Sequence, residues 1–291
     1  MHYYLRSIGF DSIRSIEDQD RLMEDVLKNY DFKKVAENED HLLFAQISKE
    51  YGQDIGVMVC GYYDRENLFH LEYYYPYLFG SQTSFCRQIA VERTALSESY
   101  NGACEDPRVG TTLIFQVINA VDYVNEKQRN EVYDSSTPVS LSGLAESGTI
   151  LLPIEKNAAQ IANESKKQAE WNSLYDAASK GDEKAYNSLT LENFDAYTTA
   201  ARRIRHEDVY TIVDSYFMPF GLECNLYNIM GMITECRKIK NSVTGEPVFI
   251  LTVSANGIPL DICIHESDLT GEPENGRRFK GIVWLQGMIN F

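Results

Sequence analysis

The chain has 291 residues and a net charge of −16, and 44% of its residues are apolar. These values exclude a disordered or low-complexity protein, and the length predicts about two domains. No apolar run approaches the roughly 18 residues that a membrane span requires. Residues 1–150 carry 13 Lys and Arg residues against 24 Asp and Glu residues. This excess of negative charge disfavours binding to nucleic acid or to an anionic membrane.

The cysteines and the first residues of the sequence both favour a cytoplasmic protein. The six cysteines lie at least 12 residues apart, so no CxxC pair indicates a redox dithiol or a zinc ribbon. The first ten residues contain a single Arg and lack the basic-then-apolar layout of a signal peptide. We therefore expect reduced thiols, cytoplasmic localisation, no metal and no cofactor.

Residues 1–156 combine a helix with a series of strands. A helix is expected over 16–30, because Ser15 can cap it and Asp18 lies at the acidic position of a capping box. Its apolar stripe consists of Ile16, Leu22, Met23, Val26, Leu27 and Tyr30. Strands are expected over 42–48, 55–63, 68–75, 85–95, 111–124, 139–144 and 149–154. Because these strands follow one another without intervening helices, they predict an α+β domain with an antiparallel sheet and packed helices.

The composition changes after residue 156. Residues 157–219 are rich in Ala, Glu and Lys with a helical period, and they predict a helical segment whose last helix spans 209–217. Residues 220–291 return to strand patterns, and glycines inside these strands indicate sharp bends. This part predicts a small antiparallel β-barrel, similar to an oligonucleotide/oligosaccharide-binding fold. The expected domains are 1–156, 157–219 and 220–291.

The register of one C-terminal hairpin follows from its sequence. Asn256-Gly257 is a strong signal for a two-residue hairpin turn. This turn pairs Ala255 with Ile258, and every second pair out to Phe249 and Ile264 is apolar. A slip by one residue would turn this apolar set to the opposite face, so the pattern predicts a single register.

A 14-residue connection, Ser97–Gly110, is the first candidate site. It is expected to be a long loop between strands, and long loops are often functional. Tyr100, Glu105, Asp106 and Arg108 give it an aromatic ring, two acids and a guanidinium group. A well-packed structural loop would use the same residue types, so both interpretations remain open.

The second candidate site is the basic group Arg277, Arg278 and Lys280. With Phe279 and Trp284 nearby, these side chains could bind a phosphate or stack a base. Alternatively, they pair with the acidic N-terminal half and dock the two domains. Three cations in an acidic segment give little electrostatic attraction for a nucleic-acid backbone, which favours the docking interpretation.

Catalytic patterns are sparse in this sequence. His70, Glu72 and Tyr74 alternate on a predicted strand, so these side chains would share one face, either for acid–base chemistry or as a solvated face. The opposite face of this strand, which includes Leu71, is expected to be the core side. The stretch 265–268, HESD, is expected to be a solvated strand end, since His265 and Glu266 point to opposite faces. Phosphate-binding glycine loops, HExxH and GxSxG are absent from the sequence.

Three stretches resemble a known family. They are MHYYLRSIGF at the start, DPRVGTTLIFQVINAVDY at 106–123 and GRRFKGIVWLQG at 276–287. They are similar to an uncharacterised clostridial (Firmicutes) family of cytoplasmic proteins that is known only as a domain of unknown function. The resemblance covers the whole chain and implies a bacterial, soluble, intracellular protein. It implies no activity, cofactor or catalytic residue.

The sequence thus favours a binding or protein-interaction protein without evident catalytic chemistry. Its partner would be another protein or a small ligand, with nucleic acid disfavoured and no membrane association. One alternative is an enzyme that acts on a small polar substrate through His70 and Glu72 or through the 97–110 loop. Another is weak nucleic-acid or oligosaccharide binding through the C-terminal barrel.

Overall fold

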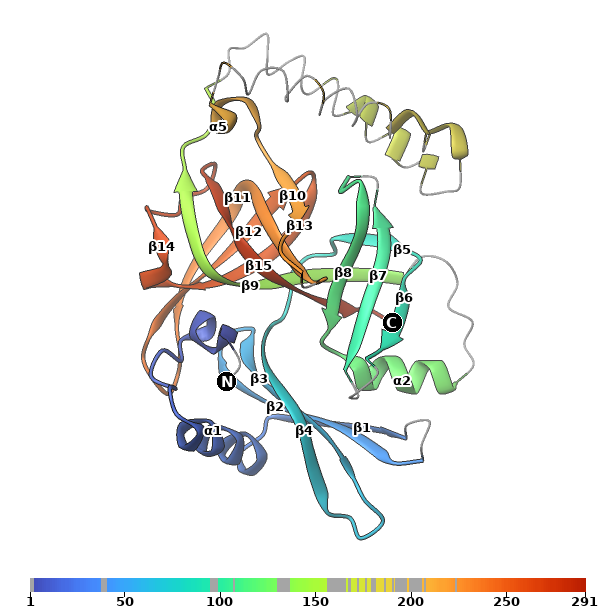
Figure 1. Ribbon diagram of the computed structural model, residues 1–291, viewed down its shortest axis with the longest axis vertical. Coiled ribbons are helices and arrows are strands. Elements are labelled where there is room, and N and C mark those ends of the chain that lie inside the picture. Colours follow the sequence, from blue (N-terminus) through green and yellow to red (C-terminus); the bar gives the residue numbers. More distant parts are fainter. Residues whose placement is uncertain are drawn as a thin grey trace.

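The computed structural model describes residues 3–37, 41–94, 99–106, 108–129, 137–155, 208–222 and 224–291, with scattered residues between 166 and 206. Strands dominate this part of the chain and form a four-stranded sheet and an eleven-stranded mixed sheet (Figure 1). The predicted α+β class was wrong, because both halves of the described chain are mostly β with few, short helices.

The first four strands of the chain form the four-stranded sheet. Its strands are β1 (Phe32–Glu37), β2 (Leu43–Gly52), β3 (Ile55–Tyr63) and β4 (Phe69–Leu78), antiparallel and in chain order. Helix α1 (Ile16–Lys28) packs against β2 and β3. Its N-terminus has the predicted capping box, in which the Ser15 side chain accepts from the Asp18 backbone and Asp18 accepts from Ser15.

A β-bulge changes the faces of β4. Tyr62 pairs with His70 and Cys60 pairs with Tyr73, so β4 has one more residue than β3 between these pairs. The extra residue reverses the alternation, and Leu71 and Tyr74 therefore share a face. The expectation that His70, Glu72 and Tyr74 share one face was wrong for this reason.

The eleven-stranded sheet contains strands from both ends of the chain. Its order is β10-β11-β12-β13-β9-β15-β8-β7-β6, with β5 and β14 on β9. The strands are β5 (Phe85–Arg87), β6 (Ala90–Arg93), β7 (Tyr100–Asp106), β8 (Thr111–Val117), β9 (Thr137–Leu151), β10 (Tyr216–Pro219), β11 (Leu226–Lys240), β12 (Pro247–Ala255), β13 (Ile258–His265), β14 (Leu269–Thr270) and β15 (Arg278–Ile289). Further helices in the continuously described ranges are η1 (Tyr3–Ile8), α2 (Ala120–Gln128), α5 (Val209–Ile212) and η2 (Glu266–Asp268).

The β12–β13 hairpin has the predicted register. Ala255 pairs with Ile258, and the ladder continues without a shift to Val248 and His265. Both turn residues, Asn256 and Gly257, have positive φ values of 51° and 74°, as a two-residue turn of this kind requires. The apolar pattern and the turn chemistry were therefore sufficient to place these two strands.

The prediction of a small, separate antiparallel barrel at the C-terminus was wrong. Strand β9, which precedes the predicted boundary at residue 156, lies between β13 and β15 and is parallel to β13. Strand β11 pairs with both β12 and β15, and β15 continues to pair with β8. The C-terminal strands are therefore part of one mixed sheet that also contains strands from the first half of the chain.

Several helix and strand assignments differ from expectation. Most of the predicted helical segment 157–219 lies outside the described residues. At its end the prediction was wrong, because Tyr216–Pro219 forms β10 against β11. The strand predicted over 111–124 ends at Val117, and α2 follows from Ala120.

The N-terminal segment lies against both sheets. Helix η1 contacts β13 and β9 of the large sheet and β4 of the small sheet (Figure 1). The Tyr4 ring stacks on Trp284 with 5.3 Å between the ring centroids, and Ile8 is fully buried. Within the described ranges, no helix combines the length and the apolarity that crossing a membrane requires.

Candidate functional site

The residues predicted in a long loop belong mostly to a strand. Tyr100, Glu105 and Asp106 lie in β7, which pairs with β8 from Asn101 to Asp106. The loop prediction was wrong because the alternating burial of Tyr100–Asp106 is that of a sheet strand rather than of a loop. Arg108 follows in the short turn before β8.

Asp106 and Arg108 form a buried ion pair. Arg108 Nη2 lies 2.6 Å from Asp106 Oδ2, and the two side chains are 8% and 0% exposed. The guanidinium also donates to the carbonyl oxygens of Gly257 (3.0 Å) and Ser84 (3.3 Å), and it lies 4.5 Å from the centroid of the Tyr175 ring. These contacts link the β7–β8 turn to the β12–β13 turn. Both charged groups are therefore partnered within the protein.

The Arg278 side chain is also occupied by protein groups. It is 6% exposed. Its guanidinium donates to the backbone carbonyl oxygens of Leu152, Tyr210 and Val213 over 2.8–3.0 Å. The guanidinium thus joins the end of β9 to α5, and its donors face carbonyl groups instead of solvent.

Arg277 and Lys280 have local partners. Arg277 Nη2 lies 2.9 Å from Glu274 Oε2, and the Lys280 ammonium lies 5.0 Å from the centroid of the Tyr210 ring. Within the described residues, none of the three basic side chains forms an ion pair with a carboxylate of residues 1–150. The structure therefore brings these side chains to α5 and to the turn before β15 rather than to the acidic N-terminal half.

The His70 imidazole is paired with Asp64 rather than with Glu72. His70 Nε2 lies 2.6 Å from Asp64 Oδ2, and the His70 ring stacks on Tyr62 with centroids 5.0 Å apart. The hydrogen bond from His70 lowers the pKa of the Asp64 carboxyl group. This pair stabilises the β3–β4 turn. Glu72 is the exposed extra residue of the bulge.

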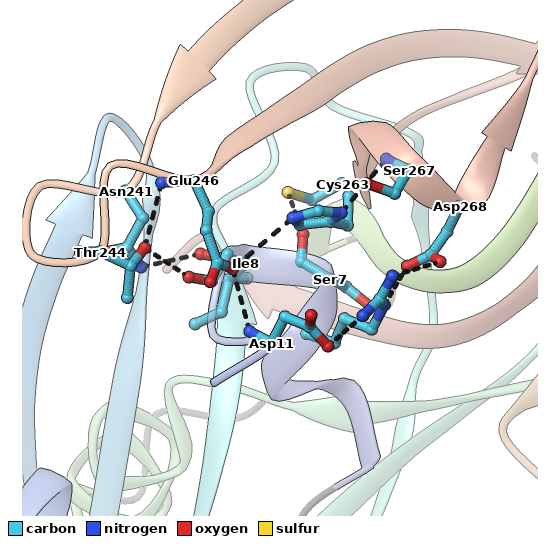
Figure 2. A network of polar contacts seen from close by, with 12 residues as sticks. Ser7, Ile8, Asp11, Asn241, Thr244, Glu246, Cys263, Ser267 and Asp268 are labelled. Carbon is cyan, nitrogen blue, oxygen red and sulfur yellow. Dashed lines mark hydrogen bonds and ion pairs between the residues drawn. The ribbon is translucent and has the colours of Figure 1, made fainter. Parts of the chain in front are cut away.

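A polar network missed by the sequence analysis connects the N-terminal segment to the C-terminal strands (Figure 2). Only 6% of the surface of His265, at the end of β13, is exposed. The solvated strand end expected at 265–268 was therefore wrong for His265, whereas Ser267 is exposed. The His265 Nδ1 accepts a hydrogen bond from the Ser267 backbone (3.2 Å). Its Nε2 lies 3.5 Å from Glu246 Oε2, which accepts from the backbone N–H of Asp11 (2.9 Å).

Cys263 brings a thiol to this network, but the thiol is not activated. Its Sγ donates to the Ser7 carbonyl oxygen over 3.1 Å. Burial raises the pKa of Cys263 far above its ordinary value, so the thiol remains protonated near neutral pH. Nucleophilic catalysis by Cys requires the thiolate. The combination of thiol, imidazole and carboxylate is therefore a structural contact rather than a catalytic triad.

The remaining contacts of the network fasten the N-terminal segment in place. Arg6 makes two hydrogen bonds to the Asp268 carboxylate, at 2.6 and 2.9 Å, and also pairs with Asp11. Asn241 donates to the Ile8 carbonyl oxygen over 2.9 Å. Because Asp268 and Asn241 lie more than 200 residues from their partners Arg6 and Ile8, no local sequence pattern could have identified these contacts. Among the described residues, no group of three or more His, Cys, Asp or Glu side chains could hold a metal ion.

The burial of the cysteines predicts a graded reactivity towards a thiol reagent. Cys86 and Cys224 are exposed, and we expect both to react rapidly with Ellman's reagent at pH 8 in the native protein. Cys60 and Cys263 are buried, with burial raising the pKa of Cys60 to about 12, and we expect them to react only after unfolding. A C86S/C224S variant should lose the fast phase, and rapid native labelling of Cys263 would contradict the assignment of its contacts.

An open groove lies between α1 and β4. It has a volume of about 460 Å³, within the usual range for ligand pockets. Its apolar lining consists of Met23, Leu27, Leu71 and Tyr74, with Asp20, Glu24 and Lys28 also contributing. Leu71 is 45% exposed. The sequence predicted the helical part of this lining as part of the apolar stripe, but it placed Leu71 in the core because it gave no sign of the bulge.

Comparison with known proteins identifies a family but no characterised relative. A family model described as "Domain of unknown function, E. rectale Gene description (DUF3881)" matches residues 5–287. No curated protein matches the chain, and no solved structure matches it. The resemblance to a family without an assigned function is thus confirmed. The geometry must then supply any argument about function.

Proposed function

Because the chain belongs to this family of unknown function, which its model matches over residues 5–287, we propose a function from the geometry. The protein is a non-catalytic binding protein of the clostridial cytoplasm, and an apolar side chain of its partner occupies the groove between α1 and β4. The six unpaired thiols support a reducing compartment.

The observation that carries this proposal is the exposed apolar lining of the groove. An isolated exposed Leu is ordinary on a protein surface, but Leu71 is adjacent to other apolar side chains in a concave site. The partly exposed rim and the buried Met23 floor resemble the anchor pockets that peptides fill with one large side chain.

The other candidate groups support binding over catalysis. Arg108 and Arg278 are each engaged by several protein groups, and the His70 imidazole is held by Asp64. The Cys263 thiol is buried and hydrogen-bonded. These groups would have to break existing contacts before they could act on a substrate. The α1–β4 groove can accept an apolar group without such a cost.

The test is a selection of peptides from a random phage-displayed library, followed by affinity measurement against two variants. Leu71→Glu places a charge in the groove, and it should weaken the selected peptides at least tenfold, since burying an unpaired charge is unfavourable. Leu68→Glu is the matched control, because Leu68 is 60% exposed and does not line the groove. It should leave the affinities unchanged.

Either of two results would overturn the proposal. The first is a selection that yields no peptide with a preference for the wild-type protein over Leu71→Glu. The second is an equal loss of affinity in both variants, which would place the binding site elsewhere on the β3–β4 hairpin. Circular dichroism would verify that the two variants keep the wild-type fold.

A further inference from the structure

The charges around the α1–β4 groove specify the partner more closely. Resting on the binding function proposed above, we infer that the groove takes a protein segment with one large apolar side chain flanked by Lys or Arg residues. The apolar side chain enters between Leu27 and Leu71. The flanking cations face the carboxylates of α1.

The acidic character of α1 comes from an excess of carboxylates over cations. The helix carries five acids, Glu17, Asp18, Asp20, Glu24 and Asp25, against two cations, Arg21 and Lys28. This gives the 13-residue helix a net charge of −3. Residues 1–150 add a wider negative field, with 24 acidic against 13 basic residues. A cationic segment is therefore attracted to this end of the molecule.

The cations near the groove are already neutralised. Lys28 pairs with Glu24 at 2.5 Å, and Arg21 lies 3.7 Å from Asp18 and 3.9 Å from Glu17. On the sheet side, Lys49 pairs with Asp25 at 2.7 Å.

One acidic side chain at the rim stands apart from these pairs. Asp20 lines the groove and is exposed, and no ion-pair partner is found for it within the described part of the chain. The groove therefore presents an apolar lining with the Asp20 carboxylate at its edge. An anionic segment would be repelled by the net negative charge of α1.

The experiment uses three synthetic peptides that share a central Leu and differ only in the flanks. Their sequences are KKSLSKK, SSSLSSS and EESLSEE, each acetylated and amidated. Binding to the full chain is followed by NMR of ¹³C-methyl-labelled methionine, since Met23 lies in the groove. We expect the Lys peptide to bind at least fivefold more tightly than the Ser peptide at 50 mM NaCl. The Glu peptide should bind more weakly than the Ser peptide.

Salt and a charge variant test the electrostatic origin of this order. Raising NaCl to 500 mM should bring the three affinities together, because the Debye length falls to about 4 Å. Asp20→Asn should weaken the Lys peptide and leave the Ser peptide unchanged. Glu105→Gln is the matched control, since Glu105 is an exposed acid on β7 of the other sheet. It should alter neither affinity.

The outcomes separate this inference from the function on which it rests. Equal affinities for the three peptides, each still lost in Leu71→Glu, would overturn the cationic partner and leave groove binding intact. Tighter binding of the Glu peptide would also overturn it. Failure of all three peptides, together with a peptide selection that yields no groove-dependent binder, would overturn the binding function itself.

Discussion

Replacement of Arg108 by alanine is expected to destabilise the protein by about 3–5 kcal/mol. The Asp106 carboxylate is fully buried, and its partner guanidinium lies 2.6 Å away. Removal of that partner leaves a carboxylate in a poorly solvated site, and it also removes the hydrogen bonds to Gly257 and Ser84. The link between the β7–β8 turn and the β12–β13 turn is lost with them.

Equilibrium urea denaturation, followed by far-UV circular dichroism, measures this effect. The double variant Asp106→Asn/Arg108→Ala should recover part of the lost stability, because an amide is less costly to bury unpaired than a carboxylate. Arg65→Ala, in the exposed β3–β4 turn, should change stability by less than about 0.5 kcal/mol. A loss at Arg108 as small as that at Arg65 would mean that the ion pair does not hold the two turns together.

The second large effect is expected at Arg278. Substitution by methionine keeps most of the side-chain volume but removes every donor to Leu152, Tyr210 and Val213. Hydrogen bonds from charged donors contribute about 1.5–3 kcal/mol each, and part of this is regained when water reaches the freed carbonyl groups. We expect a net loss of about 2–4 kcal/mol. The same urea titration measures it.

The neighbouring Arg277 provides the control for this variant. Its side chain is 28% exposed and pairs with Glu274 nearby, so Arg277→Met should cost less than about 1 kcal/mol. Arg278→Lys should fall between the two, because one ammonium cannot reproduce a planar fork of donors. If Arg277→Met and Arg278→Met lose the same stability, the carbonyl contacts of Arg278 are not the source of its effect.

The sequence was sufficient to predict features whose geometry depends only on neighbouring residues. The capping box at Ser15 and Asp18 is present in the structure, and so is the hairpin register around Asn256-Gly257. In both cases, hydrogen bonds and backbone conformations within a few residues determine the geometry. These features are independent of how the rest of the chain folds.

Features that depend on distant partners could not be predicted in this way. The alternation along β4 looked regular, but the extra residue near Glu72 exchanged the faces and exposed Leu71 in the groove. Nothing in the sequence places β9 beside β13, because an apolar run does not specify its neighbour. Asp106 and Arg108, predicted to lie in a binding loop, form a buried ion pair. Residue type alone could not distinguish these two roles, because an acid and a guanidinium group suit both.

The position of β9 between β13 and β15 also determines the order in which the sheet can assemble. Its main partners, β13 and β15, follow it by more than one hundred residues, and only the short β5 precedes it. At translation rates of roughly 5–20 residues per second, β9 leaves the ribosome on the order of ten seconds before β15. During synthesis most of β9 lacks these two partner strands, and contacts of such high sequence separation form slowly. The unpaired backbone groups of β9 are therefore open to pairing with other chains during that interval.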